Sequence, residues 1–411
     1  MIPKDLYGKS VTQIKVDVEQ KIHKRLVPME HPSLGRETPT PVRVAILGVG
    51  LIGGSLGLAI RDPDRTSRVS GRHTVVGFDD RETMQRAMEL GAIDVGSQSA
   101  PDAVAEADIV FLAAPISANL SLMTEIADAL SETAIVTDVS SVKVASEAHA
   151  ADVLPETVAY IGGHPMAGSE KTGVEHADRY LFENATYVLC PPLPARHHPS
   201  RFEPLIQLLR DLGARLLMMP SAQHDRIAAT ISHLPQLLAV ALSGFAATEN
   251  EADDRVHKLA AGGFRDMTRI ASSPFDLWNE ILLANHGPVL DALAGFSAQF
   301  QRIRNRLIEE GMQELRAEFD AARSFRESVP LSSKGFLRPL SDVYIGAADR
   351  PGALHSITTV LYTNHLNIKD IELLKLREGT GGTFRVGFDT DGDADRAVEV
   401  LLKDGHRAHR L

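Results

Sequence analysis

Cysteine is nearly absent from this chain of 411 residues, in which Cys190 is the only one. An internal disulfide framework is therefore excluded, and a reducing cytoplasm is the expected location. Basic residues are outnumbered, with 43 Lys and Arg against 54 Asp and Glu for a net charge of −11, which argues against nucleic acid or an anionic membrane as a partner. No apolar run reaches the ~20 residues of a membrane span, because the longest one, residues 234–247, contains Pro235, Gln236 and Ser243. The first residues show no apolar core, so we expect no secretory signal.

Hydrophobic residues make up 44% and charged residues 24% of the chain, which is ordinary for a globular protein. Between residues 42 and 165, apolar segments alternate with helical patterns. Strands are predicted at 42–47, 75–78, 109–114, 134–139 and 158–162, and helices at 81–90 and 120–130. This alternation predicts an α/β fold with a Rossmann-type doubly wound parallel sheet at 41–195, after an N-terminal extension at 1–40.

The strand signal ends at the proline-rich segment 190–199. Helical patterns at 202–212, 221–248, 254–260 and 275–325 predict an all-helical domain at 196–326, whose apolar faces favour a homodimer. Residues 327–339 have the composition of a linker. The segment 340–411 then shows a βαββαβ order, which predicts a small α+β domain.

The first predicted strand is followed directly by Gly48-Val49-Gly50-Leu51-Ile52-Gly53 and then by an apolar helix. A strand before and a helix after this pattern predict a dinucleotide site, in which Gly48 permits the tight turn, Gly50 the approach of a pyrophosphate and Gly53 close packing. Leu51 and Ile52 then offer backbone amides to the phosphates. The alternative is a glycine turn that binds no ligand. Asp79, at the end of the second strand, predicts a hydrogen bond to the ribose 2′-hydroxyl and hence NAD rather than NADP, a preference that Arg81 could soften.

The segment 162–170 ends the alternating region, where the carboxyl ends of the strands face the cofactor crevice. A histidine at this place, His164, can act as a general base near neutral pH. By itself, however, it would more often be a hydrogen-bonded structural histidine.

Several motifs occur in one order and spacing. They are Ile46-Leu47-Gly48-Val49-Gly50-Leu51-Ile52-Gly53-Gly54-Ser55, Asp138-Val139-Ser140-Ser141-Val142-Lys143, Gly163-His164-Pro165-Met166-Ala167-Gly168-Ser169-Glu170, His224-Asp225, Ser232-His233-Leu234-Pro235 and Gly263-Phe264-Arg265-Asp266-Met267-Thr268-Arg269. With them the chain resembles the prephenate/arogenate dehydrogenase family of tyrosine biosynthesis, from about residue 42 to about residue 307. The resemblance implies oxidative decarboxylation, in which NAD(P) accepts a hydride from the substrate ring and carbon dioxide leaves.

The resemblance also implies roles for single residues. His164 matches the histidine that hydrogen-bonds the substrate 4-hydroxyl, and Ser141 a serine at the same end of the substrate. Arg269 matches the arginine that binds a substrate carboxylate; without the resemblance we would expect it to pair with Asp266. Ser232 is also expected to bind substrate.

Other matches leave alternatives open. Glu170 and Asp225 correspond to carboxylates that could hold Arg269 or Arg265. Trp278 matches an aromatic that approaches the substrate from the partner subunit, or it is a core residue. His233 is expected to be a buried structural histidine.

Gln236 departs from the family pattern, in which many members have histidine at this place. An amide cannot carry positive charge, so the pyruvyl carboxylate of prephenate would be held less strongly, or the alanyl side chain of arogenate tolerated better. The choice between the two substrates stays open.

Residues 342–411 resemble an ACT-type regulatory domain, with a turn at Asp349-Arg350-Pro351-Gly352. We expect L-tyrosine as the effector, with Asp349, Gly352 and Asn367 around it; the alternative is a domain that only adds dimer contacts. No metal site is predicted, since the 16 histidines form no pair at ligand spacing with a matching carboxylate.

Two other classes compete with this interpretation. Another Rossmann dehydrogenase with a helical dimerisation domain, such as a β-hydroxyacid dehydrogenase or a pyrroline carboxylate reductase, would share the glycine turn but not the set around His164 and Arg269. A non-catalytic sensor would bind the dinucleotide and report amino-acid levels.

Overall fold

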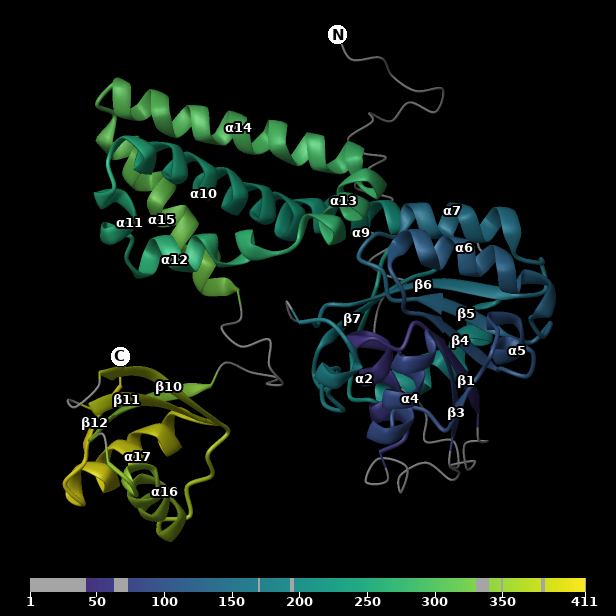
Figure 1. The fold of residues 1–411 in the computed structure, drawn as a ribbon. Helices are drawn as coiled ribbons and strands as arrows, with labels where there is room; N and C mark the ends of the chain where they lie inside the picture. The colour runs from purple at the N-terminus through teal and green to yellow at the C-terminus, as the bar shows by residue number, and fades with distance from the viewer. Residues whose placement is uncertain are drawn as a thin grey trace, which may run out of the picture. The chain divides into compact units, whose positions relative to one another are not determined.

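A computed structural model describes residues 42–62, 73–168, 171–192, 196–329, 340–348, 350–377 and 381–410 (Figure 1). The predicted N-terminal extension, most of the predicted linker, Glu170 and Asp349 lie outside the described residues.

An eight-stranded sheet forms the first part of the described chain, in the order β3-β2-β1-β4-β5-β6-β7-β8. Its strands are β1 Arg43–Leu47, β2 Thr74–Phe78, β3 Val95–Gly96, β4 Ile109–Leu112, β5 Ile135–Asp138, β6 Ala159–Pro165, β7 Thr186–Cys190 and β8 Arg215–Met218. The pairs from β3 to β6 are all parallel. This confirms the predicted Rossmann-type arrangement.

The far end of the sheet differs from the prediction of parallel strands only. Strand β7 runs antiparallel to β6, and β8 then runs parallel to β7. Strand β8 is not predicted, because its short apolar run, Leu216-Leu217-Met218, comes soon after a predicted helix; three of the four residues of β8 are exposed at the edge of the sheet. The strand signal therefore does not end at residue 190.

Helices cover both faces of the sheet. They are α2 Leu51–Ile60, α4 Arg81–Leu90, α5 Ala100–Val104, α6 Ile116–Ile126, α7 Val144–Val153 and α8 Glu203–Asp211. Side chains of β1 alternate between two cores, with Val44 and Ile46 in one and Ala45 and Leu47 in the other. This alternation is what a doubly wound sheet requires.

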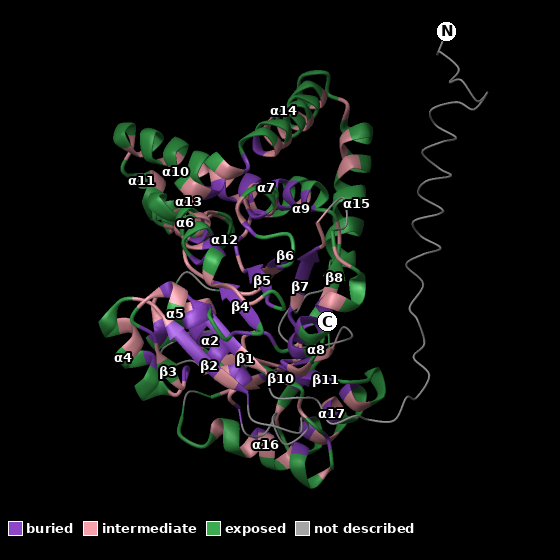
Figure 2. Ribbon diagram, turned by 90° about the vertical axis from the view of Figure 1, so that its right-hand side faces the viewer, coloured by how far each residue is buried: buried purple, intermediate pink, exposed green. Residues whose placement is uncertain are grey.

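The predicted all-helical segment is confirmed beyond β8. It contains α9 Ser221–Ala228, the π-helical turn η4 Ala229–His233, α10 Leu234–Ala252, α11 Arg255–Leu259, α12 Gly262–Thr268, the 3₁₀ turn η5 Arg269–Ser272, α13 Phe275–Ala284, α14 His286–Ile308 and α15 Met312–Ser328. Helices α14 and α15 are largely exposed (Figure 2). Their exposed residues include the large apolar side chains of Phe300, Phe319 and Phe325. The run Ser221–Ala252 is long and apolar enough to cross a membrane by length and composition, but a core helix passes the same test, and this run carries buried polar residues of the site.

The C-terminal segment has the predicted βαββαβ order. Its elements are β9 Ser341–Ala347, α16 Ala353–Thr363, β10 Asp370–Arg377, β11 Gly381–Phe388, α17 Asp391–Lys403 and β12 Arg407–His409. The strands form an antiparallel sheet in the order β10-β11-β9-β12. A separate core that includes Ile345, Leu361 and Leu401 joins this sheet to its two helices.

Candidate active site

The glycine turn between β1 and α2 combines close packing with open space. A Cβ atom on Gly53 would lie 1.9 Å from the carbonyl oxygen of Gly48, so only glycine fits there. Gly48 itself has φ +96° and packs against the backbone of Ala113 and Ala114. A Cβ atom on Gly50, in contrast, would meet nothing within 4 Å. Helix α2 begins at Leu51 without a side-chain cap at its N-terminus among the described residues, so the turn fits the phosphates of a dinucleotide.

Asp79 directly follows β2 and lies against this turn. Its Oδ2 accepts a hydrogen bond from the Val49 amide at 2.7 Å, and its Oδ1 accepts one from the Asp80 amide at 2.8 Å. The carboxylate therefore braces the glycine turn from the side. Its predicted contact with the ribose remains a prediction.

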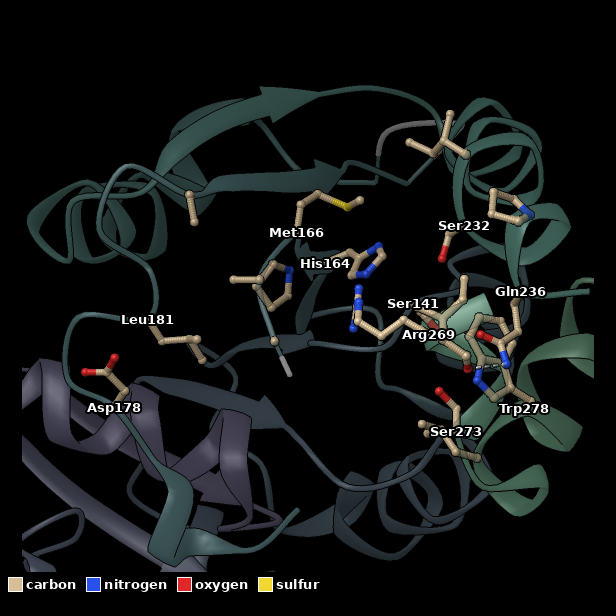
Figure 3. Close-up of a pocket in the computed structure, with 18 of the residues that line it drawn as sticks. Ser141, His164, Met166, Asp178, Leu181, Ser232, Gln236, Arg269, Ser273 and Trp278 are labelled. Carbon is tan, nitrogen blue, oxygen red and sulfur yellow. Dashed lines mark hydrogen bonds between the residues drawn. The ribbon is translucent and has the colours of Figure 1, made fainter. Parts of the chain in front are cut away.

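A cavity of about 1000 Å³ brings together residues from distant parts of the sequence. Figure 3 shows how its predicted members surround the same space: Ser141, His164, Ser232, Gln236, Arg269 and Trp278. Ser141 follows β5 and His164 lies in β6, whereas the other four come from the helical segment. Gly168, also in the cavity wall, lies close to Ile52 of α2. The cavity therefore extends toward the glycine turn.

The imidazole of His164 is held from behind by a second histidine. Its Nδ1 lies 2.8 Å from Nε2 of His224, and the two rings meet edge to face. Burial lowers the pKa of His164 well below its usual value, and His224, Lys143 and His233 lower this pKa further. His164 is therefore neutral near pH 7 and able to accept a proton.

A buried ion pair fixes the strand that carries His164. Lys143 and Asp138, both fully buried, form a salt bridge. The ammonium of Lys143 also donates to the Gly163 carbonyl at 2.6 Å, and the Gly163 amide donates to Asp138 Oδ1 at 3.2 Å. Both charges are therefore compensated, and β5 and β6 are locked together beside His164. Sequence reasoning quoted these two residues within a motif but gave them no role.

Asp225 was expected to hold Arg269 or Arg265 in place, but its hydrogen-bond partners are different ones. Its carboxylate accepts hydrogen bonds from the amides of Lys143 at 2.8 Å and Val144 at 2.9 Å, at the N-terminus of α7. It also accepts one from His224 Nδ1 at 2.7 Å. The difference arises because an almost fully buried carboxylate needs donors nearby, and the amides of α7 provide them. Glu170 lies outside the described residues.

His233 is a buried structural histidine, as expected. It is 1% exposed, and its Nδ1 lies 3.1 Å from Nδ2 of Asn285, which also donates to the Asp225 carbonyl. Burial lowers the pKa of His233 to about 4. The ring packs edge to face against Trp278, with 6.0 Å between centroids.

Trp278 lines the cavity from α13 of the same chain, and an approach to the substrate from a partner subunit stays a prediction. Its indole Nε1 is buried without a hydrogen-bond partner among the described residues. This buried atom is not open to the cavity, so Trp278 contributes the apolar surface of its ring rather than a hydrogen-bond donor.

Gln236 is almost fully buried in α10, and its Nε2 donates to the Ile270 carbonyl at 3.0 Å. It thereby ties α10 to the η5 turn that begins at Arg269. With Nε2 used in this way, the carbonyl Oε1 is the atom that Gln236 offers as an acceptor.

Of the predicted regulatory residues, Gly352 precedes α16 with φ +86°, a conformation that favours glycine. Asn367 is exposed shortly before β10. The binding of an effector at the start of α16 remains a prediction.

Comparison with known proteins identifies two families of domains in the chain. Residues 64–218 match the prephenate dehydrogenase nucleotide-binding domain, and residues 220–321 match the prephenate dehydrogenase dimerization domain. The first match begins after the glycine turn, so the evidence for that turn is structural.

Whole proteins agree with the domain matches. The prephenate dehydrogenase of Bacillus subtilis (strain 168) is 34% identical over 359 residues, which cover 87% of this chain and 95% of that protein. The crystal structure of prephenate dehydrogenase from A. aeolicus in complex with hydroxyphenyl propionate and NAD⁺ has a TM-score of 0.64 at 29% identity, covering 71% of this chain and 100% of the other. Synechocystis arogenate dehydrogenase has a TM-score of 0.61 at 30% identity, with 69% of this chain and 99% of the other covered.

Proposed function

We propose a role for each residue of the cavity from the premise that the chain belongs to the prephenate dehydrogenase family. The chain is an NAD-dependent oxidoreductase that converts prephenate to 4-hydroxyphenylpyruvate, in the biosynthesis of L-tyrosine. The observation that carries the residue roles is the position of neutral His164 in one cavity with Arg269, beside the glycine turn.

His164 takes the proton of the substrate 4-hydroxyl as this group becomes a carbonyl. Its lowered pKa keeps the ring neutral, so the lone pair of Nε2 is available as the base. Ser141 lies in the same wall of the cavity and hydrogen-bonds the same oxygen. When bound, NAD accepts the hydride, and the ring carboxylate leaves as carbon dioxide to give an aromatic product.

Arg269, at the start of the η5 turn, binds a substrate carboxylate in the cavity. A planar guanidinium with two parallel N–H donors matches the geometry of a carboxylate. Ser232 supplies a further donor, and the ring of Trp278 supplies an apolar surface. Gly48, Gly50, Leu51, Ile52 and Gly53 hold the pyrophosphate, and Asp79 binds the ribose.

The experiment that tests this function is a steady-state assay of NADH formation by the full chain with prephenate, arogenate or neither. We expect turnover with prephenate and NAD, with a higher kcat/KM than with NADP. Absence of turnover with both substrates and both cofactors would overturn the proposed function.

Arogenate is the second candidate substrate, and Gln236 is the observation that favours it. The acceptor Oε1 of Gln236 suits an ammonium group, which the alanyl side chain of arogenate carries and the pyruvyl side chain of prephenate lacks. Gln236→His should improve kcat/KM for prephenate more than for arogenate. Equal changes for both substrates would show that Gln236 takes no part in the selection.

Two further proposals concern the whole chain. The match of residues 220–321 to a dimerization domain supports a homodimer. The single cysteine, Cys190, fits a reducing cytoplasm as its location. The βαββαβ order of the C-terminal segment supports an ACT-like domain that binds L-tyrosine near Gly352 and Asn367, with Asp349 as a third candidate.

A further inference from the structure

Three side chains form a line that begins at the cavity wall and leads into the protein. His164 Nδ1 lies 2.8 Å from His224 Nε2, and His224 Nδ1 lies 2.7 Å from Asp225 Oδ1. His224 is 3% exposed and Asp225 is 1% exposed. The line joins β6 of the sheet to α9 of the helical segment and does not involve any of the residues assigned to substrate binding.

The hydrogen bonds determine which ring nitrogen of each histidine in this line carries the proton. The amides of Lys143 and Val144 can only donate, so the Asp225 carboxylate accepts from both and is held as an acceptor. His224 must then carry its proton on Nδ1, which leaves the lone pair of Nε2 facing His164. His164 in turn carries its proton on Nδ1, and the lone pair of its Nε2 lies on the side of the ring away from His224.

The surroundings disfavour a positive charge that stays on His164. Lys143 lies nearby with its charge compensated by Asp138, and His233 lies on the helical side. Burial and these groups lower the pKa of His164. The Asp225 carboxylate, at the far end of the line, contacts the ring of His224 directly and does not contact the ring of His164.

We propose that His224 and Asp225 are a proton relay behind His164, so that the proton removed from the substrate leaves its charge on His224 beside Asp225. This rests on the proposed role of His164 as the base. The O–H bond of the substrate breaks and an N–H bond forms at Nε2 of His164. The Nδ1–H bond of His164 breaks and an N–H bond forms at Nε2 of His224. No electrons are transferred in this step; the oxidation itself is completed by the hydride that NAD accepts.

His224→Gln separates the relay from simple positioning. Glutamine can accept the hydrogen bond from His164 Nδ1, and so can keep the ring in place, but it cannot take the proton. We expect kcat with prephenate to fall on the order of 10- to 100-fold, as for other groups that act through a residue in contact with the substrate. KM should stay within about twofold. His149→Gln is the matched control, because the hydrogen bonds of His149 among the described residues go to Leu120 and Thr124, away from the line, and this variant should keep both constants.

The outcomes separate the relay from the proposed function. If His224→Gln keeps kcat while His164→Asn loses it, His224 only orients the base and the relay is wrong. If His164→Asn is as active as the unaltered chain, the proposed base is wrong.

A second measurement uses the unaltered protein and needs no turnover. In the NMR spectrum of ¹⁵N-histidine-labelled protein, assigned with the His164→Asn and His224→Gln spectra, both histidines should be protonated at Nδ1. Protonation of His164 at Nε2 would direct its lone pair at His224 and would overturn the relay.

Discussion

Arg269 begins the η5 turn, and the hydrogen bond from Gln236 to Ile270 holds that turn against α10. Its side chain belongs to the cavity wall, so its position is set by the fold of the helical segment. We therefore expect the guanidinium of Arg269 to contribute more to substrate binding than to the chemical step.

Arg269→Gln should therefore raise KM for prephenate about 10-fold or more, which corresponds to the loss of a charge-assisted hydrogen bond. Because the carboxylate is bound in both the ground and the transition state, kcat should change less. Steady-state kinetics measure both constants, and Arg255→Gln, which removes an exposed pair with Asp253, is the control. A KM within twofold of the original would show that Arg269 binds something else.

Asp79 has an observed contact and a predicted function, and a single substitution would not separate them. Its Oδ2 accepts from the Val49 amide in the glycine turn, and its charge is predicted to repel a 2′-phosphate. Asp79→Ala removes both, whereas Asp79→Asn removes the charge and retains one carbonyl oxygen that can accept from the Val49 amide. We expect both variants to narrow the preference for NAD over NADP, and only Asp79→Ala to weaken the binding of both cofactors. An unchanged ratio of kcat/KM values for NAD and NADP would mean that another group recognises the ribose.

Among the elements, the turn from β1 to α2 offers a matched pair of glycines. A Cβ atom on Gly53 would collide with the Gly48 carbonyl, whereas one on Gly50 would enter open space. Gly53→Ala should lower the stability of the fold by about 1–3 kcal/mol or more, as overpacking does. Gly50→Ala should leave the stability within about 0.5 kcal/mol but weaken NAD binding, since the pyrophosphate approaches there.

Thermal unfolding and NAD titration together check this pair. A Gly50→Ala variant that binds NAD with unchanged affinity would show that the pyrophosphate does not lie over Gly50. A Gly53→Ala variant of unchanged stability would contradict the packing of α2 on β1.

Elements with local signals could be predicted from the sequence. Helix α4 was predicted at its observed bounds, because Asp80 caps its first amides and Gly91 ends it with φ +79°. Strand β8 was missed because its apolar run of three residues is too short to be distinguished from the end of the preceding helical pattern. Strand β7 was also not predicted, and its antiparallel direction depends on its connection rather than on its own residues.

Contacts between residues that are far apart along the chain could not be predicted from the sequence. The set of cavity residues was expected only through the family resemblance, and the structure brings six of them together. That Asp225 contacts His224 and the start of α7 depends on how α9 packs beside α7. No sequence pattern in α7 or α9 predicts that the two helices pack side by side.

At the scale of the whole molecule, the C-terminal segment has its own sheet and core. The N-terminus of α16 suits the carboxylate of an amino acid. If L-tyrosine binds there and weakens the binding of prephenate, prephenate must weaken the binding of tyrosine by the same factor, typically about 5–150-fold.

A chain ending at Val329 tests this regulation. It should keep its activity with prephenate and lose most of its inhibition by tyrosine, as measured by initial rates with and without tyrosine. Asn367→Ala in the full chain should weaken the inhibition in the same direction. Because tyrosine resembles the product, inhibition that is equal in the shortened and full chains would place tyrosine in the active site and leave the domain a structural role.

The central claim is that His164 is the base in the oxidation of prephenate, and His164→Asn tests it most directly. Asparagine keeps a polar group of similar reach but cannot take the proton, so kcat should fall by roughly 10²–10⁴-fold, while the dissociation constant for NAD, measured by titration, stays within about twofold. A kcat close to that of the unaltered chain, with NAD still bound, would contradict the account.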